Sequence, residues 1–475
     1  MNTIPRKIIS IIETIENEGF SAYIVGGSVR DLILGIEPND WDIATNGTPD
    51  EIEGIFGKLE DYRIKTLGKK HGTITLFESD NSRTALSEIT TFRIDGRYSD
   101  ARHPDSVKFS SSLSEDLRRR DFTINALAMD KNGKIIDPLM GLKDIEERII
   151  KAVGDPAARF NEDALRILRG IRFEGELAEY DFLMDKKTEE MMLSCKKLLS
   201  KISKERIQAE FNKILISRGA SFVLRKYQEI IEFIIGFSYQ DNLNLIGAIN
   251  PANKELGNNN SANKKLGNNN LITKTKVLKI NLAILMCKVP ENKINEILKG
   301  LKYSKEIIKD VIFLISNKDE KLLINEIYAR KMLQKMGEDR LNMLIEFKKY
   351  YISAEMGFIN EELDKEGLDK EELDNEELEK KEIKNEEKEE TYKKEIEKIA
   401  EFKKLVKKQI DEGACINGDM LEVDGNDIIK LRVKEGPIVG KALDFALEEI
   451  IEGKISNDRE AIIHCIKDFL MVYLD

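Results

Sequence analysis

The stretch from Gly26 to Asp42 constrains the fold more than any other part of the sequence. It follows an apolar run, Ala22–Val25, which is typical of a buried strand and is closed by Gly26 and Gly27. A short helix is expected from Ser28 to Leu34, and Gly35 marks its end. A helix that starts directly behind a glycine turn presents free N–H groups and the positive end of its dipole, so this turn is suited to holding phosphate.

Two aspartates follow this turn at a spacing of two. Asp40 and Asp42 flank Trp41 at the start of a predicted strand, Trp41–Ala44, and strand alternation puts both carboxylates on one face. A lone D-x-D or a lone Gly-Gly is common on protein surfaces. A segment that combines a strand, a glycine turn, a helix and paired carboxylates is much less common on protein surfaces than either motif alone. This combination is what Mg²⁺-dependent nucleotidyl transfer needs. The segment therefore predicts a magnesium site at Asp40 and Asp42.

The remainder of the first 150 residues predicts a small α/β head. Isoleucines at helical spacing predict an amphipathic helix, a capping box with proline at N1 predicts a second, and β-branched runs predict two strands. These elements are Lys7–Asn17, Thr48–Gly57, Thr73–Phe77 and Leu86–Phe92. A long polar loop is expected from Arg93 to Ser114, and Asn132-Gly133 predicts a hairpin turn.

Three consecutive arginines, Arg118 to Arg120, stand next to the strand that is predicted to run up to this hairpin. Such a run usually forms a solvated surface. Here it belongs to the same domain as the D-x-D pair, and guanidinium groups bind phosphate in a bidentate manner. We therefore expect a contact with a nucleoside triphosphate.

Helical patterns replace strand patterns after Gly154, and one of them carries a regular row of charges. Asp163, Arg166, Arg169 and Arg172 recur at i,i+3 steps, which predicts one shared helical face. An exposed ladder of ion pairs is the commonest outcome of this pattern. The alternative is base recognition: an Asp acceptor beside an Arg donor matches cytosine and adenine, whereas uracil and guanine would leave buried polar groups unpaired.

The length of 475 residues indicates several domains. We expect an α+β fold, with a mixed-sheet head over residues 1–150 and an all-α remainder: a neck over 151–215, a body over 216–410 and a tail over 411–475. Two low-complexity inserts are expected in the body, a disordered near-repeat at 252–270 and an acidic segment at 360–390 with no visible apolar face.

The net charge of −11 is concentrated in that acidic segment. Residues 360–390 contain 16 Asp or Glu against 6 Lys, a balance of −10, so the acidity does not argue against RNA binding elsewhere. Four scattered cysteines without C-x-x-C spacing exclude a zinc site of that kind, and three histidines make a histidine-built phosphohydrolase a poor fit. The sequence has no apolar run that could span a bilayer, so we expect a cytoplasmic protein with no membrane partner.

Taken together, these motifs resemble the class II tRNA nucleotidyltransferases, the bacterial CCA-adding enzymes and their poly(A) polymerase relatives. The head and neck match over about residues 20–215, and the tail matches from about residue 416. The motifs in the head and neck are Gly26–Asp31, Asp40–Asp42, Arg119–Ala126 and Glu162–Arg166, and those in the tail are Ile416–Gly418, Gly436–Leu443 and Gly453–Asn457.

The resemblance implies a seahorse-like chain and Mg²⁺-dependent addition of C, C and A to the 3′ end of tRNA from CTP and ATP. By motif, it implies metal binding by Asp40 and Asp42, with Glu88 as a further active-site carboxylate. It implies nucleotide contacts at the remaining matched positions, which are Gly27, Arg30, Arg120, Asp163, Arg166, Arg169 and Arg172. Residues in the tail would bind tRNA, and both monomer and homodimer stay open.

Two segments narrow the choice within the family. The loop Asp95–Asp105 resembles the form found in enzymes that add the final A, and Gly68–Gly72 resembles the tRNA enzymes rather than the poly(A) polymerases. Full CCA addition is therefore favoured, with an A-only tRNA enzyme and a poly(A) polymerase as alternatives. A catalytically silent RNA-binding protein would have no need of the complete set of charged residues.

Overall fold

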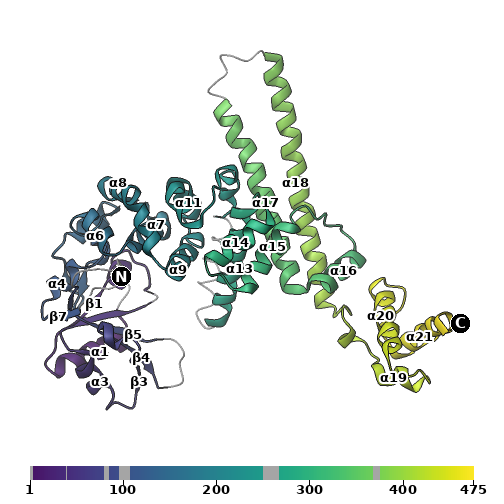
Figure 1. Cartoon of the computed structure of the whole chain (residues 1–475), viewed down its shortest axis with the longest axis horizontal. Coiled ribbons are helices and arrows are strands. Elements are labelled where there is room, and N and C mark those ends of the chain that lie inside the picture. The colour runs from purple at the N-terminus through teal and green to yellow at the C-terminus, as the bar shows by residue number, and fades with distance from the viewer. Residues whose placement is uncertain are drawn as a thin grey trace. The chain divides into compact units, whose positions relative to one another are not determined.

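The computed structural model describes residues 4–38, 40–79, 85–95, 107–249, 267–366 and 375–474 (Figure 1). The chain forms two compact units, and each is described by itself. The first comprises Met1–Ser238 and Ile297–Tyr303, and the second comprises Tyr239–Glu296 and Ser304–Asp475. The finer division into head, neck, body and tail stays a prediction.

A seven-stranded mixed sheet organises the head, in the order β3-β4-β5-β2-β1-β8-β9. Its strands are β1 (Ala22–Val25), β2 (Asp42–Thr45), β3 (Tyr62–Lys65), β4 (Thr73–Glu78), β5 (Ser87–Thr91), β8 (Ala128–Met129) and β9 (Ile135–Ile136). Neighbouring strands are antiparallel except β2 and β5, which are parallel. The expected mixed sheet with helices is confirmed, and β3 is a strand that the sequence did not predict.

The α-helices among the described residues of the head are α1 (Arg6–Asn17), α2 (Gly27–Ile33), α3 (Pro49–Phe56), α4 (Leu113–Arg118) and α5 (Gly141–Glu146). Helix α1 forms because its isoleucines recur at helical spacing, and all four of them are buried. Helix α3 begins with the predicted capping box, in which Thr48 and Glu51 satisfy each other's backbone N–H groups. The hairpin at Asn132-Gly133 is also present, between β8 and β9.

Two expectations for the middle of the head are wrong. The segment predicted as a loop contains β6 (Arg93–Asp95) paired with β7 (Val107–Phe109), because its two ends supply the β-branched and aromatic residues of a two-stranded ribbon. The loop at 96–106 itself lies outside the described residues. The three arginines do not abut the following strand: Arg118 is the last residue of α4, and the 3-10 turn Thr123–Asn125 separates the arginines from β8.

The rest of the first unit is helical, apart from a short parallel pairing of β10 (Ile149–Ile150) with β11 (Leu183–Met184). Its helices are α6 (Pro156–Glu162), α7 (Leu165–Glu176), α8 (Lys186–Cys195), α9 (Lys204–Leu215), α10 (Ala220–Lys226) and α11 (Gln228–Ile235). Glu174 ties α7 to its neighbours from a fully buried position. Its carboxylate accepts from the Met184 backbone N–H (2.9 Å), from Lys226 Nζ (2.8 Å) and from the Tyr227 hydroxyl.

The second unit is helical throughout its described residues. Its helices are α13 (Gly267–Met286), α15 (Lys305–Ser316), α16 (Glu326–Met336), α17 (Glu338–Glu366), α18 (Asn375–Asp411), α19 (Gly425–Lys430), α20 (Pro437–Ile451) and α21 (Arg459–Leu474), and α14 (Glu291–Gly300) runs from this unit into the first. The last three helices enclose an aliphatic core of their own that includes Ile428, Ala446 and Ile462.

Both predicted inserts belong to the second unit. Residues 252–266 of the near-repeat lie outside the described residues, and Gly267–Asn270 differ from the prediction because they form the first turn of α13. In the acidic segment, α17 continues to Glu366 and α18 begins at Asn375, and the two helices lie side by side (Figure 1). No helix within the described ranges is both long enough and apolar enough to cross a membrane.

Candidate active site

The parallel pairing of β2 with β5 brings two of the predicted carboxylates together. Asp42 is the first residue of β2 and lies directly opposite Glu88 of β5. Residues paired in this way project from the same face of a sheet, so both carboxylates stand on one face, and both are exposed to solvent. Asp40 differs from the prediction, since the strand begins at Asp42 and Asp40 lies in a bend ahead of it.

The charge state of Asp42 reflects this crowding. Its carboxylate can be reached by solvent, yet protein surrounds it on most sides, and this loss of hydration is the largest cause that raises its pKa to about 6. Glu88 and Asp40 raise the pKa further, whereas the guanidinium of Arg120 lowers it. The negative charges of Glu88 and Asp40 therefore act on Asp42, and the positive charge of Arg120 offsets them only in part.

The glycine turn gives these groups room. Gly26 has a φ of 78°, and a Cβ placed on it would lie 3.0 Å from Nη1 of Arg120 and 3.9 Å from Oδ2 of Asp42. A side chain at this position would be strained and would crowd the arginine. Gly27, the first residue of α2, follows directly. The turn thus brings the start of α2, Asp42 and Arg120 next to one another.

Arg30, a predicted nucleotide contact, is buried and bound within the protein. Its Nε and Nη2 donate to Oδ1 of Asp31 (2.9 and 2.7 Å), and its Nη1 donates to Oδ1 of Asn125 (2.8 Å). The guanidinium also lies 5.6 Å from the ring centre of Phe173 on α7. These contacts tie α2 to the turn at Thr123–Asn125 and to α7.

Arg120 is held by a buried aspartate that the sequence did not single out. Nη2 of Arg120 donates to Oδ2 of Asp116 (3.2 Å), and Nε and Nη2 of Arg119 donate to Oδ1 of the same residue (2.9 and 2.6 Å). Burial alone would raise the pKa of Asp116, but the two guanidiniums outweigh it and hold the pKa below its ordinary value. Nε of Arg120 is buried and has no hydrogen-bond acceptor among the described residues.

The expected helical face over residues 163–172 is wrong at its first residue. Asp163 has an extended backbone (φ −142°, ψ 102°) and ends α6, whereas α7 begins at Leu165. Aspartate favours this position because its side chain can accept from backbone N–H groups nearby, here that of Leu165 (3.1 Å). Its other oxygen accepts from Nη2 of Arg206 on α9 (2.9 Å), so Asp163 pairs with Arg206 and not with Arg166.

The three arginines do share α7, but they are not an exposed ladder, because Arg166 and Arg172 are buried. Each bonds to a different element of the first unit. Arg166 donates to Glu162 (2.6 Å) and to the backbone carbonyl of Arg119 (3.0 Å). Arg172 donates through Nε to Glu210 of α9 (2.7 Å).

Arg169 reaches back into the head, where its Nε donates to Oδ2 of Asp121 (2.7 Å). Burial would raise the pKa of Asp121, but the guanidiniums of Arg169 and Arg166 outweigh it and bring the pKa to about 2. The Phe173 ring lies 5.3 Å from the guanidinium of Arg169 and 4.2 Å from that of Arg172. One ring thus contacts arginines of both α2 and α7.

Sequence reasoning missed several residues that position this site. Asp116 carried a readable signal, because it stands three and four residues before Arg119 and Arg120. Asp121 stood inside the same motif. Arg206 and Phe173 carried no signal of this kind in the sequence, since their contacts come from the packing of helices that are distant in sequence.

The donor set of Asp40, Asp42 and Glu88 fits a hard divalent cation. All three offer carboxylate oxygens. The pKa of Asp42 is raised mainly by burial and further by Glu88 and Asp40, so a bound cation would stabilise its ionised form. In the part of the chain that the structure describes, no three His, Cys, Asp or Glu side chains already converge as a metal-ligand cluster.

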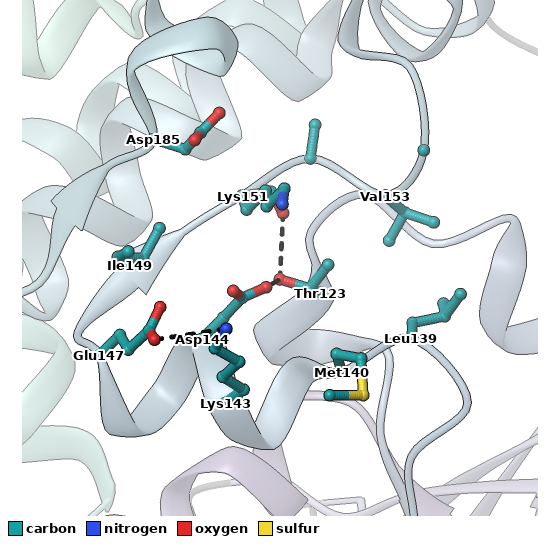
Figure 2. A pocket seen from close by; sticks show the side chains of 12 residues that line it. Thr123, Leu139, Met140, Lys143, Asp144, Glu147, Ile149, Lys151, Val153 and Asp185 are labelled. Carbon is teal, nitrogen blue, oxygen red and sulfur yellow. Dashed lines mark hydrogen bonds and ion pairs between the residues drawn. The ribbon is translucent and has the colours of Figure 1, made fainter.

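A hollow of about 490 Å³ lies elsewhere in the first unit, next to α5 and β10 (Figure 2). Within it the Thr123 hydroxyl donates to Oδ2 of Asp144 (2.5 Å), and burial raises the pKa of Asp144. None of the predicted site residues, all of which lie in the described ranges, lines this hollow. It is separate from the carboxylate pair.

Comparison with protein families gives three matches along the chain. Residues 22–151 match the poly A polymerase head domain, and residues 181–229 match a family described as the probable RNA and SrmB-binding site of polymerase A. Residues 375–466 match a putative tRNA nucleotidyltransferase domain 2.

Two relatives that are similar in sequence are both CCA-adding enzymes. The CCA-adding enzyme of Streptococcus gordonii is 46% identical over 220 residues, which is 46% of this chain and 52% of that enzyme. The chain thus aligns with about half the length of this relative. The CCA-adding enzyme of Enterococcus faecalis is 35% identical over 368 residues, 77% of this chain and 83% of that enzyme.

The fold also matches solved structures. The crystal structure of the Bacillus stearothermophilus CCA-adding enzyme in complex with CTP superposes with a TM-score of 0.65 at 24% identity, covering 98% of both chains. The likeness extends over both units of this chain, each with its own fold.

Proposed function

Because the chain belongs to the family of CCA-adding enzymes, we propose that it adds C, C and A in turn to the 3′ end of tRNA. CTP and ATP are the substrates, no nucleic-acid template is used, and each addition releases pyrophosphate. An A-only tRNA enzyme and a poly(A) polymerase are the alternatives within the same chemistry. The protein would act on tRNA in the cytoplasm.

One observation carries the proposal: the parallel register that sets Asp42 beside Glu88, next to Gly26 and Arg120. It supports nucleotidyl transfer because reaction at a triphosphate needs carboxylates for a metal, a positive group for phosphate oxygens, and backbone that allows close approach. A binding protein without catalysis has no use for two further carboxylates placed where they raise the pKa of Asp42.

The residues that would hold Mg²⁺ are Asp40 and Asp42, with Glu88 as the third carboxylate. When two ions are bound, one would lower the pKa of the attacking hydroxyl and the second would offset charge on the triphosphate and on the leaving pyrophosphate. Ionised Asp42 is needed for this, and its pKa of about 6 leaves it charged at neutral pH.

In the transfer step, the 3′-hydroxyl oxygen of the RNA attacks the α-phosphorus of the nucleotide. A new P–O bond forms, the bond from the α-phosphorus to the bridging oxygen breaks, and pyrophosphate leaves with the electron pair. The hydroxyl proton passes to water or to a nearby carboxylate, for which Asp42 and Glu88 are placed. Arg120 binds oxygens of the triphosphate through the N–H groups that Asp116 does not occupy.

Base choice is assigned to Asp163 and Arg166. Each carboxylate oxygen of Asp163 accepts one protein hydrogen bond and has a second lone pair for the exocyclic amino group of cytosine or adenine. Arg166 bonds to protein through Nη1 and Nη2 and has five N–H donors in all, so donors are left for the adjacent ring nitrogen. Arg169, Arg172 and Arg30 would support this pocket by fixing α2, α7 and Phe173 against one another.

An incorporation assay on three tRNA substrates tests the proposal. Purified protein with Mg²⁺ receives tRNA that ends before CCA, after the first C, or after CC, with labelled CTP, ATP, UTP or GTP. We expect all three to be completed to CCA, with UTP and GTP rejected. Addition only to tRNA ending in CC would indicate an A-only enzyme, homopolymeric A on unrelated RNA a poly(A) polymerase, and no incorporation would refute nucleotidyl transfer.

A further inference from the structure

Asp116 occupies an unusual position for a charged residue. It is fully buried in the short helix α4, and both of its oxygens are taken by the two arginines that follow this helix. A buried carboxylate that lost these partners would be strongly unfavourable, so the three side chains form one unit.

The first arm of this unit is Arg120, which reaches the carboxylate pair. Its Nη1 lies against Gly26, on the side of Asp42, yet within the described residues no ion pair joins Arg120 to Asp42. Asp116 is the carboxylate that Arg120 contacts instead. Arg120 therefore stays close to Asp42 without forming an ion pair with it, and keeps N–H groups for an anion that enters from solvent.

The second arm is Arg119, which reaches the helix that carries the proposed base-selecting residue. Its side chain bonds to Asp116, and its backbone carbonyl accepts from Nη2 of Arg166 (3.0 Å). The backbone of Arg119 thus helps to hold the buried Arg166 guanidinium, whose Nη1 is bound by Glu162. A shift of the α4 end would move both arms together.

We infer that Asp116 is a positioning residue for nucleotide addition, which orients Arg120 toward the triphosphate and, through Arg119, fixes Arg166 for base selection. The inference rests on the proposed function. Asp116 does not itself touch substrate. It couples the catalytic half of the site to the base-selecting half through two adjacent residues.

The test is the steady-state kinetics of Asp116→Asn, which keeps the shape and one acceptor but removes the charge. We expect the KM for both CTP and ATP to rise about tenfold or more, because Arg120 is released toward Asp42. We also expect the ratio of kcat/KM for CTP to that for UTP to fall. Partial misfolding would lower only the apparent kcat, since it reduces the number of active molecules without altering KM or the ratio.

Two variants complete the experiment. Glu115→Gln makes the same chemical change at an exposed neighbour on α4 and should leave both quantities at the wild-type level. Arg119→Gln leaves the Asp116–Arg120 contact in place, so it should lower the CTP to UTP ratio with a smaller change in KM, and it serves if Asp116→Asn does not fold. Wild-type values of KM and of the CTP to UTP ratio in Asp116→Asn, or a wild-type ratio in Arg119→Gln if Asp116→Asn does not fold, would overturn the inference. Failure of the wild-type protein to add nucleotides would overturn the proposed function and the inference with it.

Discussion

Replacement of Asp163 by alanine is the sharpest test of base selection. In the structure its carboxylate accepts from the Leu165 N–H at 3.1 Å and from Nη2 of Arg206 at 2.9 Å. Asp163→Ala removes both of these bonds and the acceptor that we assign to the amino group of cytosine or adenine. Its effects on stability and on selectivity differ in size and can be separated.

The stability cost is modest. Loss of the bond to the first turn of α7 costs about 1 kcal/mol, by analogy with capping residues, and loss of the partly exposed ion pair costs up to about 1 kcal/mol. The catalytic cost is larger, because a hydrogen bond to a charged group contributes about 1.5–3 kcal/mol. This corresponds to a decrease of about 10- to 150-fold in kcat/KM for CTP and ATP.

UTP should not share this loss. In the wild-type site the carboxylate would face a carbonyl oxygen of uracil, and its removal relieves that repulsion. The ratio of kcat/KM for CTP to that for UTP should therefore fall by at least the factor lost for CTP. The measurement is single-nucleotide addition to tRNA that lacks CCA, with each nucleotide tested separately over a range of concentrations.

Arg206→Gln is the matched control, because it breaks the same ion pair and leaves the Asp163 carboxylate in place. It should lower the thermal midpoint by less than Asp163→Ala does, because the bond from the Leu165 N–H stays, and it should retain most of the preference for CTP. Equal losses for CTP and UTP in Asp163→Ala would refute the reasoning. So would an equal fall of the ratio in both variants, since the pair would then serve packing alone.

Three further outcomes are expected. Asp42→Asn should abolish nucleotide addition while tRNA binding and the circular dichroism spectrum stay unchanged, and near-wild-type turnover would contradict the metal assignment. Because the pKa of Asp42 is raised to about 6, its charged form is lost as the pH falls through 6. The Mg²⁺ concentration for half-maximal rate should therefore rise about tenfold per pH unit below that value. Mg²⁺ titrations that show no dependence on pH would argue against Asp42 as a ligand. Glu174→Ala should destabilise the first unit by about 3–5 kcal/mol, measured by urea unfolding, because it leaves Lys226 and Tyr227 without their buried acceptor. A loss of stability below about 1 kcal/mol would mean that other acceptors replace Glu174.

Local patterns in the sequence were sufficient for the strand–turn–helix core of the site. The run from Ala22 to Val25, the glycine turn and the isoleucines of α1 each produce the predicted element, because spacing and turn chemistry act over a few residues. The resemblance supplied Glu88, whose pairing with Asp42 connects strands 46 positions apart across an intervening hairpin. No local pattern encodes that register.

The errors also have physical causes. Asp163 continued the i,i+3 spacing of the arginines, but the tendency of aspartate to bond nearby backbone N–H groups ended one helix there and started the next. Arg206 and Phe173 meet the site only through the packing of α9 and α7. Charge rows in a sequence predict a helical face, and they do not reveal which partner on another element each charge will find.

The order of the site along the chain has a consequence for synthesis on the ribosome. Strands β1, β2 and β5 are complete once Thr91 has emerged, whereas Arg120 follows later and the Asp163–Arg206 pair later still. Domains generally fold from the N-terminus as they are made. A nascent chain thus acquires its reactive carboxylates first and its means of discrimination last, and a chain truncated after the head would keep the former without the latter.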